Sequence, residues 1–184
     1  MAIHFFAQPR LVNTVCAAAV LALSGAAAVA QDASSGPDAL SETYRDWIVR
    51  CQTAPAQGDQ PGARLCEMVQ ELRQQEGRQR VLSIALRPEE DAGVGFLTMI
   101  TPFGLKVIEQ VQIDLDGATI AQAPFQTCLP QGCIVQASLG ETAIAAMRGG
   151  ETAVIRLPTT TGEAFEVSIS LLGFTAAWMR LSEL

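Results

Sequence analysis

Apolar and polar residues alternate with a period of two through most of the second part of the chain. Four segments carry the alternation most clearly: 44–51, 81–87, 107–115 and 165–171. Glu109 is the single exception within its segment. Because a sheet buried on both faces would lack a polar face, the pattern predicts half-buried antiparallel strands. Several short strands at close spacing favour a sandwich or a barrel.

Turn residues separate these segments. Asp116-Gly117 predicts a type I′ hairpin, because both central residues of that turn need a positive φ. Further turn signals occur at Pro102-Phe103-Gly104, Gly149-Gly150 and Thr161-Gly162.

Two segments follow helical spacing instead. The apolar residues of 139–148 repeat every fourth position, which predicts a short helix or turn crossing between strands. Residues 175–184 predict a terminal helix, with Phe174, Trp178 and Leu181 facing the core.

One apolar segment alternates less cleanly and contains Phe96, Met99, Ile100 and Phe103. We predict a strand buried on both sides here. The alternative is that some of these side chains are exposed and form a small binding patch. Both tryptophans lie on apolar faces of their elements, so we expect them in the core.

The first 30 residues predict a cleavable export signal. Arg10 precedes a small, apolar stretch over 11–30, which ends in Ala28-Val29-Ala30, the A-x-A pattern that a signal peptidase accepts. The alternative is an uncleaved anchor, since about twenty apolar residues can just span a bilayer. The second half of the stretch is alanine-rich and weakly hydrophobic, which favours cleavage. Cys16 lies inside it without a lipoprotein context, so we expect its removal.

The expected organisation is a signal peptide at 1–30, a flexible leader at 31–43 and one domain at 44–184. The leader is expected because its first part is rich in Ser, Gly, Pro and Asp and lacks periodicity. The mature chain would have 154 residues, enough for one domain with a hydrophobic core.

The mature chain would be acidic, with 11 cationic side chains against 19 acidic ones and a net charge of −8. Such a chain should not bind nucleic acid or anionic lipid through bulk electrostatics. Nothing after residue 31 approaches a membrane-spanning length.

Four cysteines remain after the expected cleavage: Cys51, Cys66, Cys128 and Cys133. Four cysteines allow three pairings, and spacing alone does not select one. We favour Cys51–Cys66 and Cys128–Cys133, because each pair flanks a loop with turn residues. A redox pair or a Cys₄ zinc site is the alternative, but exported cysteines usually form structural disulfides.

Catalytic chemistry has few candidates. The only histidine precedes residue 31, so no Ser-His-Asp or Cys-His site can form in the mature chain. Lys106 is the only lysine and is expected as a solvated cation at a strand edge. A carboxylate-dependent hydrolase would need two converging acids, and weak calcium binding would need several. The candidates are Glu89, Glu90, Asp91, Asp114 and Asp116.

An ordered series of motifs runs through the mature chain. It comprises Trp47-x-Val49-x-Cys51, Cys66-x-Met68, Pro102-x-Gly104-Leu105, Phe125-x-x-Cys128-x-x-x-Gly132-Cys133 and Ser170-Leu171-Leu172-Gly173-Phe174-x-x-Ala177. The series resembles the invasion-associated locus B family of exported α-proteobacterial proteins, over about residues 44–184.

The resemblance implies a mostly β fold, an immunoglobulin-like antiparallel β-sandwich, to which the periodicity adds one short crossing helix and a C-terminal helix. It also implies a periplasmic or outer-envelope location and a structural role for the four cysteines. The family has no established catalytic residues, so the resemblance supplies none. Its name refers to host-cell invasion, although many members belong to bacteria that invade nothing.

The leading hypothesis is an exported, non-catalytic module of the envelope that binds a protein or supports the envelope, without a metal or cofactor. It would act through an exposed sheet face, a strand edge or the Pro/Gly-rich loop at 54–64. Its partner would be an envelope or host protein. The alternative is a surface adhesion or invasion factor, which the acidic chain disfavours because host surfaces are also negative. A carboxylate-dependent hydrolase is the third hypothesis. The sequence leaves the oligomeric state open.

Overall fold

The computed structural model describes residues 39–55, 62–76, 79–89 and 93–184. The expected export signal (1–30), residues 31–38 of the expected leader and residues 56–61 of the Pro/Gly-rich loop lie outside these ranges. The elements follow in the order β1 (Ala39–Tyr44), β2 (Trp47–Thr53), β3 (Arg64–Arg73), β4 (Arg80–Pro88), β5 (Gly95–Thr101), β6 (Val111–Leu115), β7 (Ala118–Ala123), β8 (Phe125–Leu129), β9 (Gly132–Leu139), α1 (Glu141–Gly149), β10 (Thr152–Leu157), β11 (Phe165–Ser170) and α2 (Phe174–Leu181).

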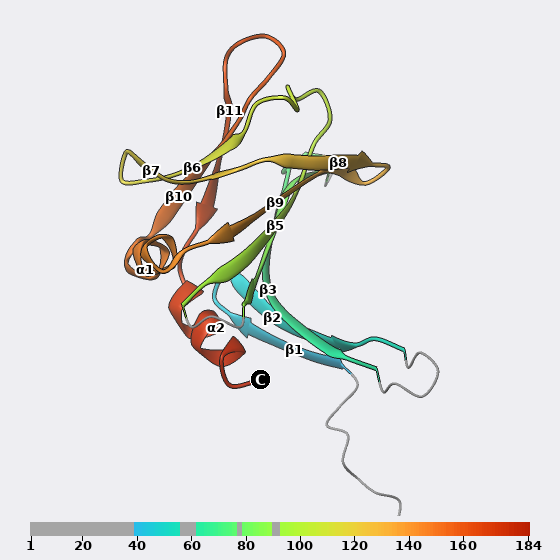
Figure 1. Ribbon diagram of the computed structural model, residues 1–184, viewed down its shortest axis with the longest axis vertical. Coiled ribbons are helices and arrows are strands. Elements are labelled where there is room, and N and C mark those ends of the chain that lie inside the picture. The colour runs from blue at the N-terminus through green and yellow to red at the C-terminus, as the bar shows by residue number, and fades with distance from the viewer. Residues whose placement is uncertain (1–38, 56–61, 77–78, 90–92) are drawn as a thin grey trace, which may run out of the picture. The chain divides into compact units, whose positions relative to one another are not determined.

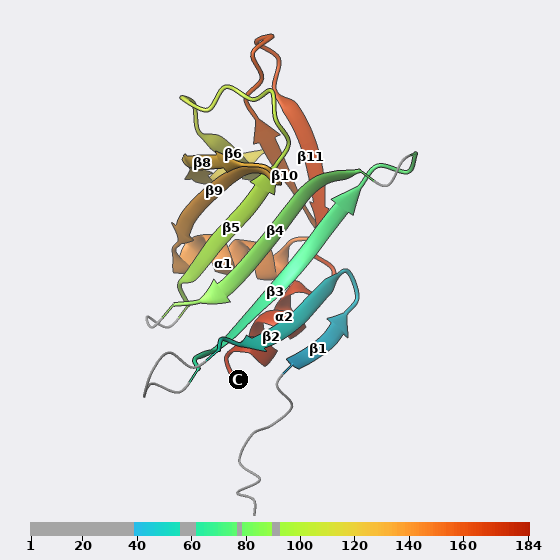
Figure 2. The same ribbon diagram turned by 90° about the vertical axis from the view of Figure 1, so that its right-hand side faces the viewer.

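Antiparallel pairing organises the described strands into two sheets (Figure 1). The larger sheet has the order β1-β2-β3-β4-β5-β9-β8, and the smaller sheet has the order β11-β10-β6-β7. The smaller sheet and both helices lie on the same side of the larger sheet, as two perpendicular views show (Figure 1, Figure 2). The predicted fold class, a mostly β antiparallel sandwich with a short helix and a C-terminal helix, is confirmed.

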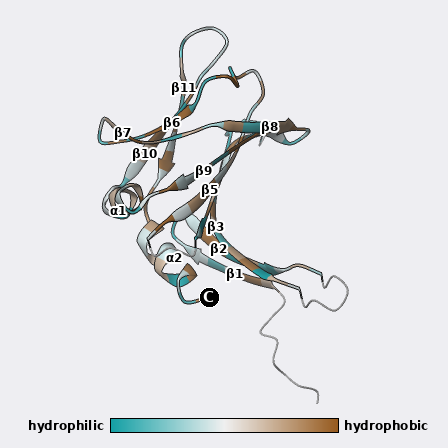
Figure 3. Cartoon of the chain, viewed as in Figure 1, coloured by the Kyte–Doolittle hydropathy of each residue, from teal (hydrophilic) through white to brown (hydrophobic). Residues whose placement is uncertain are grey.

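The period-two alternation determines which face of each strand enters the core. In β2, Trp47, Val49 and Cys51 are buried while the residues between them are exposed. Hydrophobic and hydrophilic residues succeed one another along the strands in Figure 3. The inward side chains of both sheets meet those of the two helices in one hydrophobic core. Burial of this apolar surface is the main favourable contribution to folding.

Both predicted helices are confirmed. Helix α1 buries Ala143, Ile144 and Met147. Helix α2 starts at Phe174 and buries that residue, Ala177, Trp178 and Leu181. The predicted hairpin at Asp116-Gly117 is also confirmed, since the two residues have φ values of 49° and 80°.

The start of the domain differs from the sequence expectation. Residues 39–43, expected as the end of a flexible leader, belong to β1 and pair with β2. The predicted strand 44–51 is interrupted, because the chain reverses at Arg45-Asp46, where Arg45 has a φ of 53°. The leader prediction is therefore wrong for residues 39–43.

The predicted strand 107–115 is also shorter, since β6 begins only at Val111. The backbone N–H of Glu109 donates to the carbonyl oxygen of Lys106 at 3.0 Å, and the N–H of Lys106 donates to that of Pro158 at 2.8 Å. These bonds form a turn that is fastened to the loop after β10. Lys106 lies in this turn and not at the start of a strand.

The side chain of Gln70 links the two sheets. Gln70 lies on β3 and is only 8% exposed. Its Nε2 donates to the backbone oxygens of Asp46 (3.1 Å) and Ser170 (3.0 Å), and its Oε1 accepts from the N–H of Ser170 (3.0 Å). Trp47 Nε1 donates to the same Ser170 oxygen at 2.9 Å. A buried amide with its hydrogen bonds satisfied thus joins β3, the β1–β2 turn and the end of β11.

Gly173 lies beside this junction and precedes α2. Its φ is 90°, and a Cβ at this position would lie 2.0 Å from the carbonyl oxygen of Tyr44. The close approach brings Phe174 against Trp47, with ring centroids 5.4 Å apart in an edge-to-face arrangement. Phe174 in turn stacks with Trp178, at 6.2 Å.

An ion pair fastens α2 to β1. Arg180 Nε and Nη2 donate to the two carboxylate oxygens of Glu42, at 2.8 and 3.1 Å. The Tyr44 hydroxyl donates to the same carboxylate at 2.8 Å. The hydrogen bonds from Arg180 and then from Tyr44 hold the pKa of Glu42 below its ordinary value, and the bond to Glu42 raises the pKa of Tyr44.

We predict that Gly173→Ala destabilises the fold far more than Gly104→Ala. Both glycines have a left-handed φ, 90° and 87°, but a Cβ at Gly104 would meet no atom within 4 Å. Gly104→Ala should therefore show only the conformational cost of roughly 1–2 kcal/mol. Gly173→Ala adds the clash with Tyr44, so its free energy of unfolding in urea should fall by more than that or folding should fail. Equal losses in the two variants would contradict the proposed close approach.

We predict that Glu42→Gln removes part of the acid sensitivity of the fold. Because the folded pKa of Glu42 is lowered, its contribution to stability is full above its ordinary value of 4.5 and is lost as the pH falls through the folded pKa. The difference in melting temperature between the native protein and Glu42→Gln should therefore be largest near neutral pH and shrink in acid. Glu163→Gln, on the β10–β11 loop, serves as the control. A constant difference across the pH range would contradict the prediction.

Candidate binding surface

Both favoured disulfides are present. Cys51 and Cys66 are directly opposite each other on β2 and β3, and Cys128 and Cys133 are directly opposite on β8 and β9. Each pair therefore closes a hairpin between adjacent antiparallel strands. Cysteines joined in this way are neither free thiolates for redox chemistry nor ligands for zinc, which fits the structural role predicted for them.

The three candidate acids that the structure describes, Glu89, Asp114 and Asp116, lie on different elements or turns. Glu89 follows β4 and accepts a hydrogen bond from Ser138, whereas Asp114 lies in the smaller sheet. Asp114 is nearly buried. Its carboxylate forms an ion pair with Arg156 Nε at 2.6 Å and accepts a hydrogen bond from the Thr119 hydroxyl at 2.7 Å. Asp116 lies in the hairpin turn.

Two of the candidate acids, Glu90 and Asp91, lie outside the described residues. Among the residues that are described, no three His, Cys, Asp or Glu side chains gather closely enough to hold a metal ion. The absence of a metal or cofactor remains a prediction.

The segment between β5 and β6 exposes large apolar side chains. Phe103 is 61% exposed, Val107 52% and Ile108 87%. The prediction of a strand buried on both sides is therefore wrong: β5 alternates buried and half-buried residues, and Phe103 beyond it faces solvent. Such a concentration of exposed apolar residues in one loop is typical of a binding surface.

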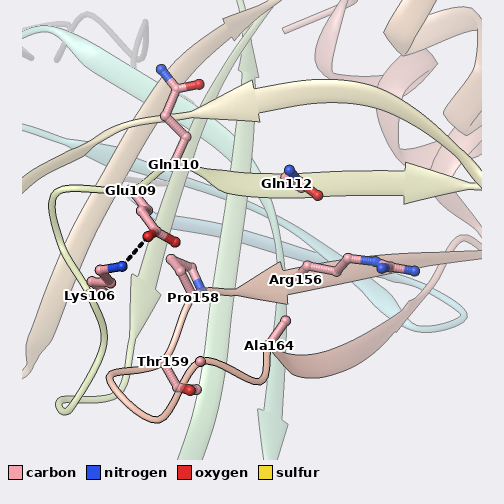
Figure 4. A pocket seen from close by; sticks show the side chains of 9 residues that line it. Lys106, Glu109, Gln110, Gln112, Arg156, Pro158, Thr159 and Ala164 are labelled. Carbon is pink, nitrogen blue, oxygen red and sulfur yellow. Dashed lines mark hydrogen bonds and ion pairs between the residues drawn. The ribbon is translucent and has the colours of Figure 1, made fainter.

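Backbone contacts hold this loop in place. Leu105 pairs with Thr159 in an isolated β-bridge and packs against the core. Lys106 forms an ion pair with Glu109 across the turn (Figure 4). The inward Leu105 and the bonded turn therefore keep the neighbouring Val107 and Ile108 in solvent.

A polar cavity of about 250 Å³ lies at the base of the loop, between β6, β10 and the β10–β11 loop (Figure 4). Its charged side chains are compensated within the protein. Lys106 pairs with Glu109, and Arg156 pairs with Asp114 at 2.6 Å and with Glu166 at 3.5 Å. Each of the three charged side chains that line the cavity has an ion-pair partner, so none of them is left free to select a charged small ligand.

On the other side, the loop borders the β8–β9 hairpin. Phe103 lines a second cavity of about 250 Å³ with Pro130 and Gly132 from the hairpin turn. Val107 lines a third, of about 140 Å³, with residues of β8 that include Cys128. Leu129, at the end of β8, is itself 42% exposed. We call Phe103, Val107, Ile108 and Leu129 the apolar tip.

The apolar tip lies at the opposite end of the described domain from α2 (Figure 1, Figure 2). The sequence analysis gave Phe103 only as part of an alternative, a small exposed binding patch, and missed the rest of the tip, because alternation assigned Val107 to the inner face of a strand. The break in the pattern at Glu109 is the one signal that could have located it, since Lys106 and Glu109 are spaced for an ion pair across a turn.

A two-sheet antiparallel sandwich with hairpin disulfides and an apolar loop at one end belongs to the class of small, disulfide-stabilised β domains. Residues 47–182 match the model of the invasion associated locus B (IalB) protein family. The chain therefore belongs to this family, as the motif series predicted.

Individual relatives agree with the family assignment. The chain is 35% identical over 167 residues to an invasion protein B homolog of Brucella abortus (strain 2308), covering 89% of this chain and 91% of that protein. It is 29% identical over 157 residues to invasion protein B of Bartonella bacilliformis, covering 82% of this chain and 78% of that protein. The crystal structure of invasion associated protein B from Bartonella henselae superposes with a TM-score of 0.67 at 26% identity, covering 78% of this chain and 95% of that one.

Among the described helices, none has the length and apolar composition needed to cross a bilayer. The two disulfides are consistent with an exported protein.

We predict unequal contributions of the two disulfides to stability. In the chain-entropy model, Cys51–Cys66, with a sequence separation of 15, should contribute roughly 3 kcal/mol, and Cys128–Cys133, with a separation of 5, about 2 kcal/mol. Urea denaturation of the Cys51→Ser/Cys66→Ser and Cys128→Ser/Cys133→Ser double variants measures both. The reverse order, or no loss from the first variant, would contradict the prediction.

Proposed function

We propose that this protein is an exported, non-catalytic module of the cell envelope that acts by binding through the apolar tip. The observation that carries the proposal is the exposure of Phe103, Val107 and Ile108 on a loop whose backbone is held in place. Exposing such side chains to water is unfavourable and makes a protein prone to aggregation. The presence of three of them on one loop therefore favours a binding role.

A binding role without catalysis is supported by the distribution of reactive groups. The expected mature chain has no histidine, its cysteines are in disulfides, and its described candidate acids lie on different elements or turns, with Asp114 bound to Arg156. General acid–base and nucleophilic catalysis both need reactive groups positioned together in one cleft.

An envelope location is supported by the export signal expected at 1–30 and by the disulfides, which persist in oxidising compartments. The relatives are named for invasion. The net charge of −8 expected for the mature chain opposes direct adhesion to negatively charged host surfaces, so we place the protein's action inside the envelope.

We predict that a photo-crosslinking amino acid at Ile108 captures an envelope component in cells that make the protein. The same residue at Met179 should not, because Met179 is a 54% exposed apolar side chain on α2, at the other end of the domain. Mass spectrometry of the adducts gives the partner's class. Equal labelling at both positions, or none at Ile108, would count against binding through the tip.

Protease treatment of intact cells provides the accompanying control for location. Protection of the protein supports a periplasmic position, whereas digestion would support surface display.

A further inference from the structure

We infer that the cavity lined by Phe103, Pro130 and Gly132 binds a carboxylate group of a partner polypeptide, with the guanidinium of Arg80 as the anchor. The inference rests on the proposed function, since Phe103 belongs to the apolar tip, and it adds the chemistry by which the partner is recognised. The selecting group is a cation and not an apolar side chain of the tip.

Arg80 is the charged side chain of this cavity, and its charge is not compensated. Arg80 begins β4 and lines the cavity. Among the described residues, no carboxylate forms an ion pair with it. Its partner in the β3–β4 pairing is Arg73, a second cation, which pairs with Glu71 at 2.7 Å. The cavity therefore differs from the polar cavity at the base of the β5–β6 loop, where Lys106 and Arg156 both pair with acids.

A hydrogen bond to the β8–β9 turn positions the guanidinium of Arg80. Its Nη2 donates to the carbonyl oxygen of Gln131 at 2.5 Å. A guanidinium has several N–H donors, and this bond uses one of them, so others are left for a ligand. Because the long side chain is already held, a ligand has less side-chain freedom to remove when it binds.

The β8–β9 turn is itself fixed to the end of β5. The Thr101 hydroxyl donates to the carbonyl oxygen of Cys133 at 3.1 Å, and Cys133 is joined to Cys128 by the disulfide. A Cβ on Gly132 would lie 2.3 Å from the carbonyl oxygen of Thr101, so the turn packs directly against β5. These contacts form the wall of the cavity before any ligand binds, as is usual for ligand sites.

The charge of the cavity selects a carboxylate. A guanidinium binds a carboxylate through paired N–H···O bonds, and the single cation of Arg80 balances one negative charge. A phosphomonoester carries roughly −1.5 to −2 charges at pH 7, so part of its charge would stay uncompensated. The domain is already acidic, with an expected net charge of −8 after cleavage, which adds to that cost.

The size and the apolar wall of the cavity favour a polypeptide over a free metabolite. Its volume of about 250 Å³ is below the roughly 300–1,000 Å³ of pockets that enclose a whole small ligand, so it suits one side chain or a chain end. The 61% exposed ring of Phe103 offers an apolar contact beside the cation. An Asp, a Glu or a C-terminal carboxylate next to an apolar side chain matches both features. Arginine and aromatic residues are also enriched at protein interfaces.

An NMR titration of the mature protein with N-acetylphenylalanine tests the inference. The probe should shift the Gly132 amide resonance, and N-acetylphenylalanine amide, which has the same ring without the charge, should bind about tenfold more weakly or not at all. Arg80→Gln should abolish the shift, whereas Arg80→Lys should keep part of it, because lysine retains the charge but not the fork. Arg64→Gln, which removes an exposed arginine at the other end of β3, is the matched control and should bind as the native protein does. Urea denaturation establishes that each variant is folded.

A second measurement connects the cavity to the partner. Arg80→Gln should lower the yield of the photo-crosslink at Ile108 in cells, and Arg64→Gln should not. An undiminished yield in Arg80→Gln would overturn the inference.

The other outcomes separate the inference from the proposed function. Equal binding of the acid and its amide, or unchanged binding by Arg80→Gln, would exclude the carboxylate site. A larger shift at Gly132 from inorganic phosphate than from N-acetylphenylalanine would assign the cavity to a phosphate group instead. If the titration fails but the crosslinker at Ile108 captures a partner, the inference is wrong and the proposed function stands. If capture at Ile108 fails as well, both are wrong.

Discussion

The buried amide of Gln70 and the close contact of Gly173 with Tyr44 hold the two sheets at a fixed distance. Two of the three hydrogen bonds of this side chain join β3 to Ser170 on β11, a hundred residues away in the sequence. A buried amide is costly to leave unpaired, so any displacement of β11 from β3 would forfeit these bonds together. Gly173 lets the chain leave β11 and enter α2 within this same small volume.

The rest of the core is arranged around that junction. Phe174 contacts Trp47 and Trp178, so the aromatic cluster bridges β2 and α2. The bond from Arg180 to Glu42 holds the far end of α2 against β1. The covalent links lie on hairpins of the larger sheet. Noncovalent packing therefore joins the layers, while the disulfides stabilise strand pairs within one layer.

The sequence predicted the fold better than the site. Alternation identified the half-buried strands, and the spacing of Phe174, Trp178 and Leu181 identified α2, because a single period describes each of these elements. The hairpin at Asp116-Gly117 followed from the φ requirement of its two residues. Turn chemistry failed at Arg45-Asp46, where no glycine marks the left-handed residue. β1 was missed because the leader, inferred from the composition of its first part, was extended to residue 43.

The apolar tip was harder to predict. Alternation identifies the apolar face of a segment only if that segment is a strand. Val107 continued the alternation of β6, although it lies in the turn that is closed by the bond from the Glu109 N–H to the Lys106 oxygen. The burial of Gln70 was likewise hidden, because its partners, Asp46 and Ser170, are far away in the sequence. Both features depend on tertiary contacts that one local pattern does not encode.

The placement of the tip and the placement of the stabilising contacts are complementary. The Gln70 junction and the aromatic cluster are built around α2, whereas the tip lies at the other end (Figure 1). Near the tip, order comes from the Cys128–Cys133 bond and from the Leu105–Thr159 bridge, which need no large core. The loop can therefore present Ile108 to a partner while the core keeps its packing. Because few contacts of the junction reach the tip, substitutions in the tip should alter binding with little effect on folding. A loop carried on a rigid scaffold in this way can change its sequence, and so its partner, while the core stays the same.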